Sequence, residues 1–335
     1  MRIAVDAMGG DHAPEVVVKG TLDAALKWPD LELILVGLPA KIRDCAGGTL
    51  PANVEIEEAA ETIAMGEHPA AAVRQKKNAS IVVATRLVKE QKAQALVSAG
   101  STGAQMAAAL FGLGRVRGIE RPAIGTVLPT KTGGKILLDV GANPDAKPEN
   151  LYQFAVMGSI YAEHILNIER PSVALLNIGS EEGKGNLTAQ AAYTLLKESD
   201  LNFIGNVEGK DLPWGRADVV VCDAFVGNIV LKTIEGLSSY LFSQIKESLT
   251  ASTSRKIGAA LVKPALKEIA GKLDYSVYGG APLLGVQGTS IVCHGRSNAT
   301  AIMNAIGVAR RCIEERIVER ITEILREEKV NALSE

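Results

Sequence analysis

The chain opens with Met1-Arg2-Ile3-Ala4-Val5-Asp6-Ala7-Met8-Gly9-Gly10-Asp11-His12, and this stretch decides the fold class. A short apolar run with the character of a strand ends at Asp6, and a Gly-Gly turn with a second acid follows it. Ala13-Pro14-Glu15 then begins a helix. In open α/β sheets, ligands bind at turns of this kind, at the carboxyl ends of the strands. Strand-to-helix turns also favour Gly and Asp for conformational reasons, so the motif alone indicates either a turn or a site.

The composition points to the same class. The chain has 335 residues, 47% of them hydrophobic and only 4% aromatic. This profile is typical of helices packed on a buried, largely parallel sheet. The net charge of -2 gives no general attraction to nucleic acid, and no RNA or DNA motif is present. We expect one α/β domain over residues 1–335 and no nucleic-acid partner.

Cysteine usage and apolar runs predict the compartment. Four widely separated cysteines form no C-x-x-C pair: Cys45, Cys222, Cys293 and Cys312. This spacing argues against a disulfide framework or a structural zinc site and fits a reducing cytoplasm. The chain enters a strand without a charged leader, and its longest apolar stretch, around Ala104–Gly114, is too short to cross a bilayer. We therefore expect a soluble, cytoplasmic protein.

Strand-like runs alternate with helical patterns, which predicts an open, largely parallel sheet with helices on both faces. The expected strands are Arg2–Asp6, Leu31–Val36, Val54–Glu57, Ala95–Ser98, Ala123–Val127, Ile136–Val140, Val173–Asn177, Asn202–Gly205, Val219–Asp223 and Ser290–His294. The expected helices include Pro14–Lys27, Ala79–Lys92, Ser101–Gly112, Lys147–Leu166, Gly185–Glu198 and a final helix, Asn298–Glu328.

One region, Val226–Lys272, is long, helical and without strands, and we expect it to project from the α/β body. Its segment Ser254–Pro264 mixes apolar and basic side chains, namely Ile257, Leu261 and Val262 with Arg255, Lys256 and Lys263. A basic amphipathic tip suits a membrane surface or a partner helix. A buried contact within a helical hairpin is the alternative explanation.

A second polar glycine loop, Ser98-Ala99-Gly100-Ser101-Thr102-Gly103-Ala104, runs from a strand into a helix. Small residues let a ligand approach the backbone, and a helix start offers N–H groups and the positive end of its dipole. Together with three hydroxyl groups, this favours a phosphate. Ser101 or Thr102 could instead serve only as a helix cap.

Further loops of this kind follow other strands, at Asp139–Asn143, Asn177–Lys184, Asp223–Asn228 and Cys293–Asn298. Several strand ends carrying Asp, Asn, Ser or His beside Gly indicate a shared cleft along one edge of the sheet, suited to a compact polar anion. Asp6, Asp11, Asp139 and Asp223 would be the candidate ligands of a metal, but no spacing requires one, and we predict none.

The chain lacks the usual signs of a catalytic nucleophile. It has no G-x-S-x-G elbow, and Cys222 and Cys293 lie inside strand patterns, so we expect both thiols to be buried. His12 and His294 follow strand ends and are candidates for acid–base or anion-contact roles.

These motifs together resemble the bacterial phosphate acyltransferase family PlsX, in order from Met1 to the final helix. The matching segments are Asp6–Pro14, Ser98–Ala104, Asp139–Asn143, Asn177–Glu181, Tyr278–Ala281 and His294-Gly295. Departures are modest: Ser101 replaces an expected asparagine, Ala224 and Val226 replace Gly and Thr, and Arg296 replaces a small residue.

The resemblance implies an enzyme that makes acyl phosphate, for phospholipid synthesis, from inorganic phosphate and an acyl group on acyl carrier protein. It also implies a fold similar to the isocitrate and isopropylmalate dehydrogenases and to phosphotransacetylase. A homodimer, peripheral membrane attachment, and no metal or nicotinamide cofactor are further implications. The alternatives are a phosphotransacetylase-type enzyme acting on acyl-CoA, a dehydrogenase on the same fold, and a non-catalytic membrane scaffold.

From this resemblance we predict roles for the loop residues. The predicted phosphate-binding residues are Ser98, Gly100, Ser101, Thr102 and Gly103. Lys184 or His12 would neutralise charge in the transition state, one of them protonating the leaving sulfur, and Asp6, Asp11 and Asp139 would orient these groups. The predicted substrate-binding residues are Gly9, Gly10, Asn143, Asn177, Gly179, Ser180, Glu181, Asp223, Asn228 and His294. Candidates for docking the acidic carrier are Arg74, Lys76, Lys77, Arg115 and Arg117.

Overall fold

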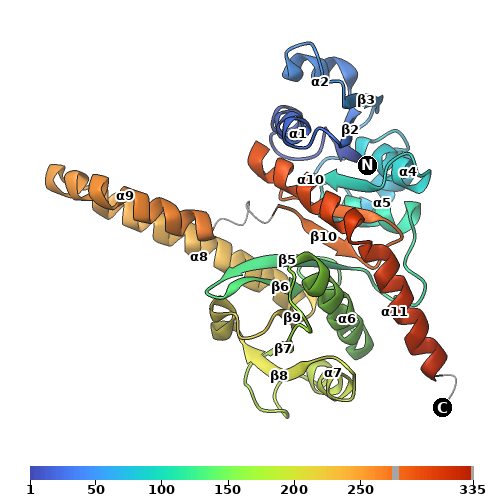
Figure 1. Cartoon of the computed structure of the whole chain (residues 1–335), viewed down its shortest axis with the longest axis vertical. Coiled ribbons are helices and arrows are strands. Elements are labelled where there is room, and N and C mark those ends of the chain that lie inside the picture. Colours follow the sequence, from blue (N-terminus) through green and yellow to red (C-terminus); the bar gives the residue numbers. More distant parts are fainter. Residues whose placement is uncertain (274–278, 333–335) are drawn as a thin grey trace.

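The computed structural model describes residues 1–273 and 279–332, and its strands form one 11-stranded sheet in the order β3-β2-β1-β4-β11-β10-β5-β6-β9-β7-β8 (Figure 1). The strands are β1 (Arg2–Asp6), β2 (Glu32–Gly37), β3 (Val54–Glu58), β4 (Ala95–Ser98), β5 (Ala123–Thr130), β6 (Gly133–Leu138), β7 (Val173–Asn177), β8 (Phe203–Glu208), β9 (Val219–Val221), β10 (Ala281–Leu284) and β11 (Thr289–Val292).

The sheet consists of two parallel blocks joined by antiparallel strands. Strands β3, β2, β1, β4 and β11 are mutually parallel, as are β6, β9, β7 and β8. Between the blocks, β10 is antiparallel to both β11 and β5, and β5 is antiparallel to β6. The predicted open, largely parallel sheet is therefore confirmed. Strand β10 was missed because it follows a Gly-Gly pair and contains Pro282, a pattern typical of a turn.

Helices cover both faces of this sheet, as predicted. They are α1 (Glu15–Lys27), α2 (Pro39–Ala46), α3 (Pro69–Gln75), α4 (Ser80–Lys89), α5 (Thr102–Gly112), α6 (Pro148–Ile165), α7 (Leu187–Lys197), the 3₁₀ helix Gly209–Trp214, α8 (Ala224–Thr250), α9 (Thr253–Leu273), α10 (Ala299–Glu314) and α11 (Ile317–Ala332).

Each face of the sheet has its own hydrophobic core. In β1, Ile3 and Val5 belong to the buried cluster that also contains residues of α1, α6 and α10, whereas Ala4 belongs to the other cluster, with residues of α4 and α5. This alternation follows from the two-residue period of a strand. Both sides being buried explains why the strands are continuously apolar.

The expected final helix, Asn298–Glu328, is wrong in one respect, because it is two helices. Helix α10 ends at Glu314, α11 begins at Ile317, and Arg316 between them has a φ of 53°. A left-handed residue cannot continue a right-handed helix, so the chain changes direction here. The amphipathic pattern continues across the break and therefore did not reveal it.

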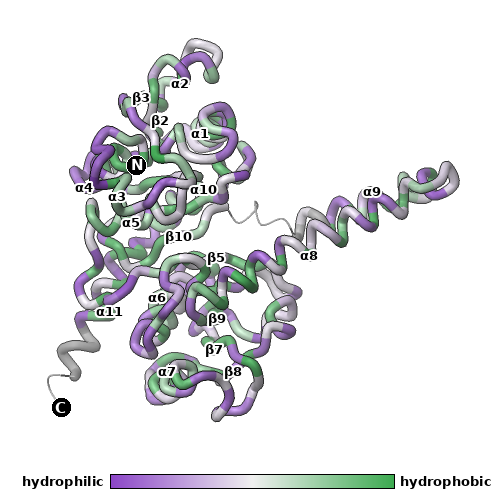
Figure 2. The backbone as a smooth tube through the Cα atoms, turned by 180° about the vertical axis from the view of Figure 1, so that it is seen from behind, coloured by the Kyte–Doolittle hydropathy of each residue, from purple (hydrophilic) through white to green (hydrophobic). Residues whose placement is uncertain are grey.

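Helices α8 and α9 form an antiparallel hairpin that projects from the α/β body (Figure 1). Hydrophobic and hydrophilic residues alternate along its length (Figure 2), and large apolar side chains such as Leu237, Leu241 and Leu261 are exposed. Within the described part of the chain, we find no helix that is long and apolar enough to cross a membrane. The hairpin is therefore an exposed amphipathic element.

Candidate active site

A cavity of about 270 Å³ opens where the two blocks of the sheet meet. Its walls come from the first residue of α5, the segment after β6, the first turns of α8, and the end of β11 with the loop that follows. The polar and charged residues that line it include Thr102, Asn228, Lys232, Glu235 and His294. Much of the remaining wall is apolar, including Ile124, Val140, Leu231 and Val292. This is a concave, partly apolar site with a few convergent polar groups, as expected of a substrate site.

Helix α8 presents one face to this cavity. Asp223 is its N-cap and accepts a hydrogen bond from the N–H of Val226 at 2.8 Å. The spacing of Asn228, Lys232 and Glu235, at i, i+4 and i+7, brings them to the same side of the helix. Asp223 thus acts on the helix start, and the cavity contacts come from residues one to three turns further on.

Three chargeable groups meet in the cavity. The ammonium of Lys232 lies 2.8 Å from Oε2 of Glu235 and 3.1 Å from Nε2 of His294. Nδ1 of His294 accepts a hydrogen bond from the N–H of Arg296 at 3.1 Å. Burial, and then the charge on Lys232, lowers the pKa of the His294 imidazole, so its neutral form is favoured at neutral pH.

Next to the cavity, Asp6 connects the loop that follows β1 with the loop that follows β4. Its carboxylate is buried, and Oδ2 accepts a hydrogen bond of 2.7 Å from the Ser98 hydroxyl. That hydroxyl in turn accepts from the N–H of Gly100 at 3.0 Å. Burial raises the pKa of the Asp6 carboxyl more than its hydrogen bonds lower it. Asp6 and Ser98 therefore hold the backbone of the predicted phosphate loop.

At the start of α5, Ser101 and Thr102 have different roles, which the sequence alone did not distinguish. The Ser101 hydroxyl is the N-cap and accepts from the N–H of Ala104 at 3.4 Å, whereas Thr102, the first helical residue, lines the cavity. The start of α5, where the positive end of the helix dipole lies, thus borders the cavity through Thr102. Gly103 packs against Pro69, where an added Cβ would lie 2.7 Å from Pro69 Cγ.

The loop after β1 contacts the loop after β11. The N–H of Asp11 donates to the carbonyl of Gly295 at 2.8 Å, and the Asp11 carboxylate lies 4.0 Å from the Arg296 guanidinium. Gly10 has a φ of 113° and also approaches Gly295. His12 is exposed beyond this contact. The structure therefore brings the first and last predicted loops together, and His12 lies at their outer side.

Asp139 organises its own loop rather than the cavity. Its oxygens accept hydrogen bonds from the N–H groups of Ile124, Gly141, Ala142 and Asn143 and from the Asn143 side chain, at 2.7–3.1 Å. The Asn143 amide also donates to the carbonyl of Pro122. Burial raises the pKa of the Asp139 carboxyl more than these bonds lower it. Asp139 and Asn143 are thus engaged inside the protein, and the residues of this motif that line the cavity are Val140 and Gly141.

The fourth loop, Asn177–Gly185, lies away from the cavity and is closed on itself. The side chain of Asn177 donates to the carbonyl of Lys184, and the Lys184 ammonium lies 3.8 Å from the Glu181 carboxylate. The carbonyl of Glu181 accepts from Asn206 on β8. Ser180, Glu181 and Lys184 are exposed, whereas Gly179 is buried under the side chains of the loop. The structure does not bring this loop into the shared cleft, and the role of Lys184 stays a prediction.

Of the predicted site residues, Thr102, Asn228 and His294 line the cavity, and Asp6, Gly9, Ser98 and Gly100 support one of its walls. Sequence reasoning missed Lys232 and Glu235. Their helical spacing from Asn228 was the available signal, but any amphipathic helix shows the same spacing.

The thiols are structural. Cys222 and Cys293 are buried, as predicted, and burial raises the pKa of Cys293 to about 12. A thiol of this kind stays protonated and is a poor nucleophile. Among residues 1–273 and 279–332, no cluster of three or more His, Cys, Asp or Glu side chains could hold a metal ion.

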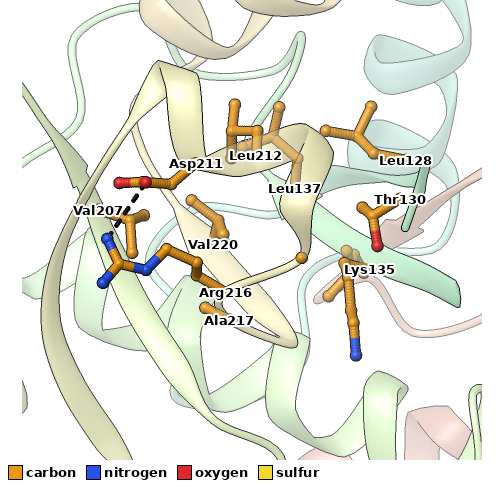
Figure 3. A pocket seen from close by; sticks show the side chains of 12 residues that line it. Leu128, Thr130, Lys135, Leu137, Val207, Asp211, Leu212, Arg216, Ala217 and Val220 are labelled. Carbon is orange, nitrogen blue, oxygen red and sulfur yellow. Dashed lines mark hydrogen bonds and ion pairs between the residues drawn. The ribbon is translucent and has the colours of Figure 1, made fainter. Parts of the chain in front are cut away.

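A second, much smaller cavity lies between β5, β6, β9 and the 3₁₀ helix Gly209–Trp214, at one side of which Asp211 pairs with Arg216 (Figure 3). Its volume of about 10 Å³ is close to the space that one water molecule occupies, and its lining is largely apolar. This space is a packing defect and is too small for an acyl group or a phosphate.

The architecture is an α/β fold that phosphotransacetylases share. A phosphotransacetylase from Streptococcus pyogenes has the same fold, with a TM-score of 0.59 and 19% identity over 94% of each chain. A 4-hydroxythreonine-4-phosphate dehydrogenase from Klebsiella pneumoniae gives a TM-score of 0.54 and 12% identity over 92% of this chain and 98% of that one. Similarities this distant show the fold alone.

The chain belongs to the family described as fatty acid synthesis protein, whose sequence model matches residues 1–320. It is 64% identical over 323 residues to the phosphate acyltransferase of Desulfitobacterium hafniense (strain DSM 10664 / DCB-2), covering 96% of both chains. It is also 59% identical over 326 residues to the phosphate acyltransferase of Heliobacterium modesticaldum, covering 96% of this chain and 97% of the relative. The predicted resemblance and the acyltransferase class are confirmed.

Proposed function

We propose that this enzyme transfers a fatty acyl group from acyl carrier protein to inorganic phosphate and releases acyl phosphate for phospholipid synthesis. The observation that carries the proposal is the cavity in which the start of α5 faces the cation-bearing side of α8. Relatives at 50–64% identity over nearly the whole chain, named phosphate acyltransferase, support the use of phosphate.

The chemistry explains why no activated nucleophile is needed. A phosphate oxygen of HPO₄²⁻ attacks the thioester carbonyl, the C–S bond breaks, and the proton of the phosphate passes to the departing sulfur. The products are acyl phosphate and the carrier thiol. Because the dianion is already nucleophilic, the protein contributes binding, orientation and charge stabilisation. The buried, protonated thiols described above are consistent with direct transfer.

The acyl donor can be tested directly. We expect the purified enzyme to form acyl phosphate from acyl-acyl carrier protein and phosphate. Activity with acyl-CoA but none with the acylated carrier would instead favour the phosphotransacetylase-type alternative.

Among the candidate residues for docking the carrier protein, Arg74 stacks on Phe111 and Lys76 pairs with Glu67, while Lys77 is exposed.

The predicted roles of Lys184 and His12 have a separate test. If either group neutralises charge in the transition state or protonates the sulfur, its alanine variant loses about 100-fold in kcat, the usual contribution of such a group. Steady-state assays of Lys184→Ala and His12→Ala measure this. The matched control is Lys197→Ala, which removes an exposed lysine that pairs with Glu182. Turnover within a few-fold of the parent in both variants would remove both residues from the mechanism.

We also propose that the enzyme is a cytoplasmic homodimer that attaches to the inner face of the membrane through residues 254–264. The resemblance supports the dimer, and sedimentation at the mass of one chain would contradict it. Exposed apolar side chains at the end of the hairpin support the attachment, since Ile257 is 66% and Leu261 80% exposed.

For membrane attachment we expect Leu261→Glu to reduce binding to vesicles of phosphatidylglycerol and phosphatidylethanolamine by about tenfold or more. The change removes about 2 kcal/mol of apolar transfer and adds a charge that the anionic surface repels. Vesicle flotation measures binding, and activity on soluble substrate should be unchanged. Leu187→Glu, at an equally exposed site on α7, is the control. Equal flotation of Leu261→Glu and the parent would refute this attachment.

A further inference from the structure

The 270 Å³ cavity lies over an apolar part of the sheet. Ile124 of β5, Val292 of β11 and Val140, which follows β6, line it, and all three belong to the hydrophobic core on one face of the sheet. Ala281 of β10 and Leu231 of α8 also line it and pack against the same core. We call these five side chains the apolar floor. The floor is continuous with the core, so one side of the cavity is suited to hydrocarbon.

Most of the polar lining comes from other parts of the cavity wall. Lys232 and Glu235 lie on α8, and Thr102 lies at the start of α5, whereas Thr126 is the polar residue that β5 adds. A site with charged groups on one wall and an apolar floor fits a ligand that has one polar and one apolar end. An acyl thioester has this chemistry, and relatives at up to 64% identity are named phosphate acyltransferase.

Ala281 has the smallest side chain among the strand residues that line the cavity. It pairs with Val292 across the antiparallel strands β10 and β11. At Gly280, directly before it, an added Cβ would lie 2.3 Å from Cγ2 of Ile291, so the backbone here lies close against β11. Position 281 therefore cannot move further toward β11, and a larger side chain at this position would occupy space in the cavity.

We propose that the acyl chain of the donor binds on the apolar floor with its thioester toward the polar wall, and that the small side chain of Ala281 makes space for the chain. This rests on the proposed function and deepens it, because it assigns a binding site to the acyl chain. Each methylene that leaves water for an apolar site strengthens binding about fourfold. Ala281 is therefore a residue that determines selectivity for acyl-chain length.

The test compares long and short acyl donors. Ala281→Leu fills part of the cavity, and we expect it to lower the ratio of kcat/KM for the hexadecanoyl donor to kcat/KM for the butyryl donor by about tenfold or more. This is the effect of displacing about two methylenes from the floor. Ala281→Val adds fewer atoms and a side chain that suits a strand, so a several-fold fall in the same ratio is expected even if the leucine variant does not fold. Leu231→Ala removes part of the floor and should also lower the ratio several-fold.

The control is Ala191→Leu, which enlarges an exposed alanine of α7 outside the cavity. Calorimetric titration with octylphosphonate and butylphosphonate measures binding of the chain independently of turnover, and thermal unfolding checks the fold. The parent should bind the octyl compound more tightly, and Ala281→Leu should reduce this difference.

A kcat/KM ratio within twofold of the parent in both Ala281 variants would overturn the proposal. So would an equal loss with every donor, because the cavity would then bind a part that all donors share. A parent that uses acyl-CoA but not the acylated carrier would instead refute the proposed function. The same ratio measured with hexadecanoyl-CoA and butyryl-CoA would then still test the acyl site.

Discussion

Gly9→Ala is expected to lower turnover by about 100-fold or more while the chain still folds. A Cβ at this position would lie 2.6 Å from Oδ2 of Asp6 and 2.7 Å from the backbone nitrogen of Gly100. Neither neighbour can move freely, because Asp6 is buried and bonded to Ser98. The β1 loop and the start of α5 would have to separate, and a displacement of about 1 Å at a reacting site can cost this much in rate.

Steady-state kinetics measure the Gly9 effect, and circular dichroism checks that the fold is retained. The control is Gly209→Ala, because an added Cβ there meets no atom within 4 Å. We expect Gly209→Ala to have normal kinetics. Normal kinetics in Gly9→Ala as well would show that the contact between the two loops is unimportant for catalysis.

Gly227→Ala is expected to destabilise the protein by about 1–3 kcal/mol, the usual cost of overpacking, and to reduce activity at the same time. The added Cβ would lie 2.0 Å from the carbonyl oxygen of Asp139. The Asp139 carbonyl lies in a loop that is held in place, because the Asp139 carboxylate accepts five hydrogen bonds. Helix α8 would therefore have to move. The movement would carry Asn228 and Lys232 away from their positions in the cavity.

Urea denaturation and steady-state kinetics on the same preparations measure both effects. Gly236→Ala is a matched control, because it lies on the same helix and its Cβ would meet nothing within 4 Å. Alanine is the better helix former, so this variant should be as stable as the parent or about 0.5–1 kcal/mol more stable. Equal stability and activity of the two variants would contradict the packing of α8 on the Asp139 loop.

Local patterns were sufficient to predict most of the sheet. Ten of its eleven strands follow from apolar runs, most of them β-branched and bounded by Gly, Pro, Asn or Asp, and the helices between them follow from their amphipathic period. Strand β10 and the break at Arg316 were missed. In both cases the local pattern favoured another structure. Strand β10 forms because it pairs with β11 and β5. The break between α10 and α11 depends on the left-handed backbone of the single residue Arg316.

The candidate site was predictable only in part. The loops that contain Asp6, Ser98 and His294 were recognisable, because glycine beside a polar residue at a strand end has few structural explanations. Lys232 was not, since a lysine on an amphipathic helix is normally solvated. The structure places it 3.1 Å from a histidine 62 positions away, a contact that local sequence patterns do not specify.

By itself, the sequence determined most of the strands, helices and turns, together with the α/β class and the resemblance to a family of acyltransferases. Only the tertiary structure decided which loops meet. The order of the strands places β4 and β11 side by side, brings the end of β6 to the start of α8, and leaves the Asn177–Gly185 loop outside the cavity. The physical reason is the separation along the chain over which each interaction acts. Turn and helix preferences act over a few residues, whereas the site depends on strand pairing between segments that are far apart in the chain.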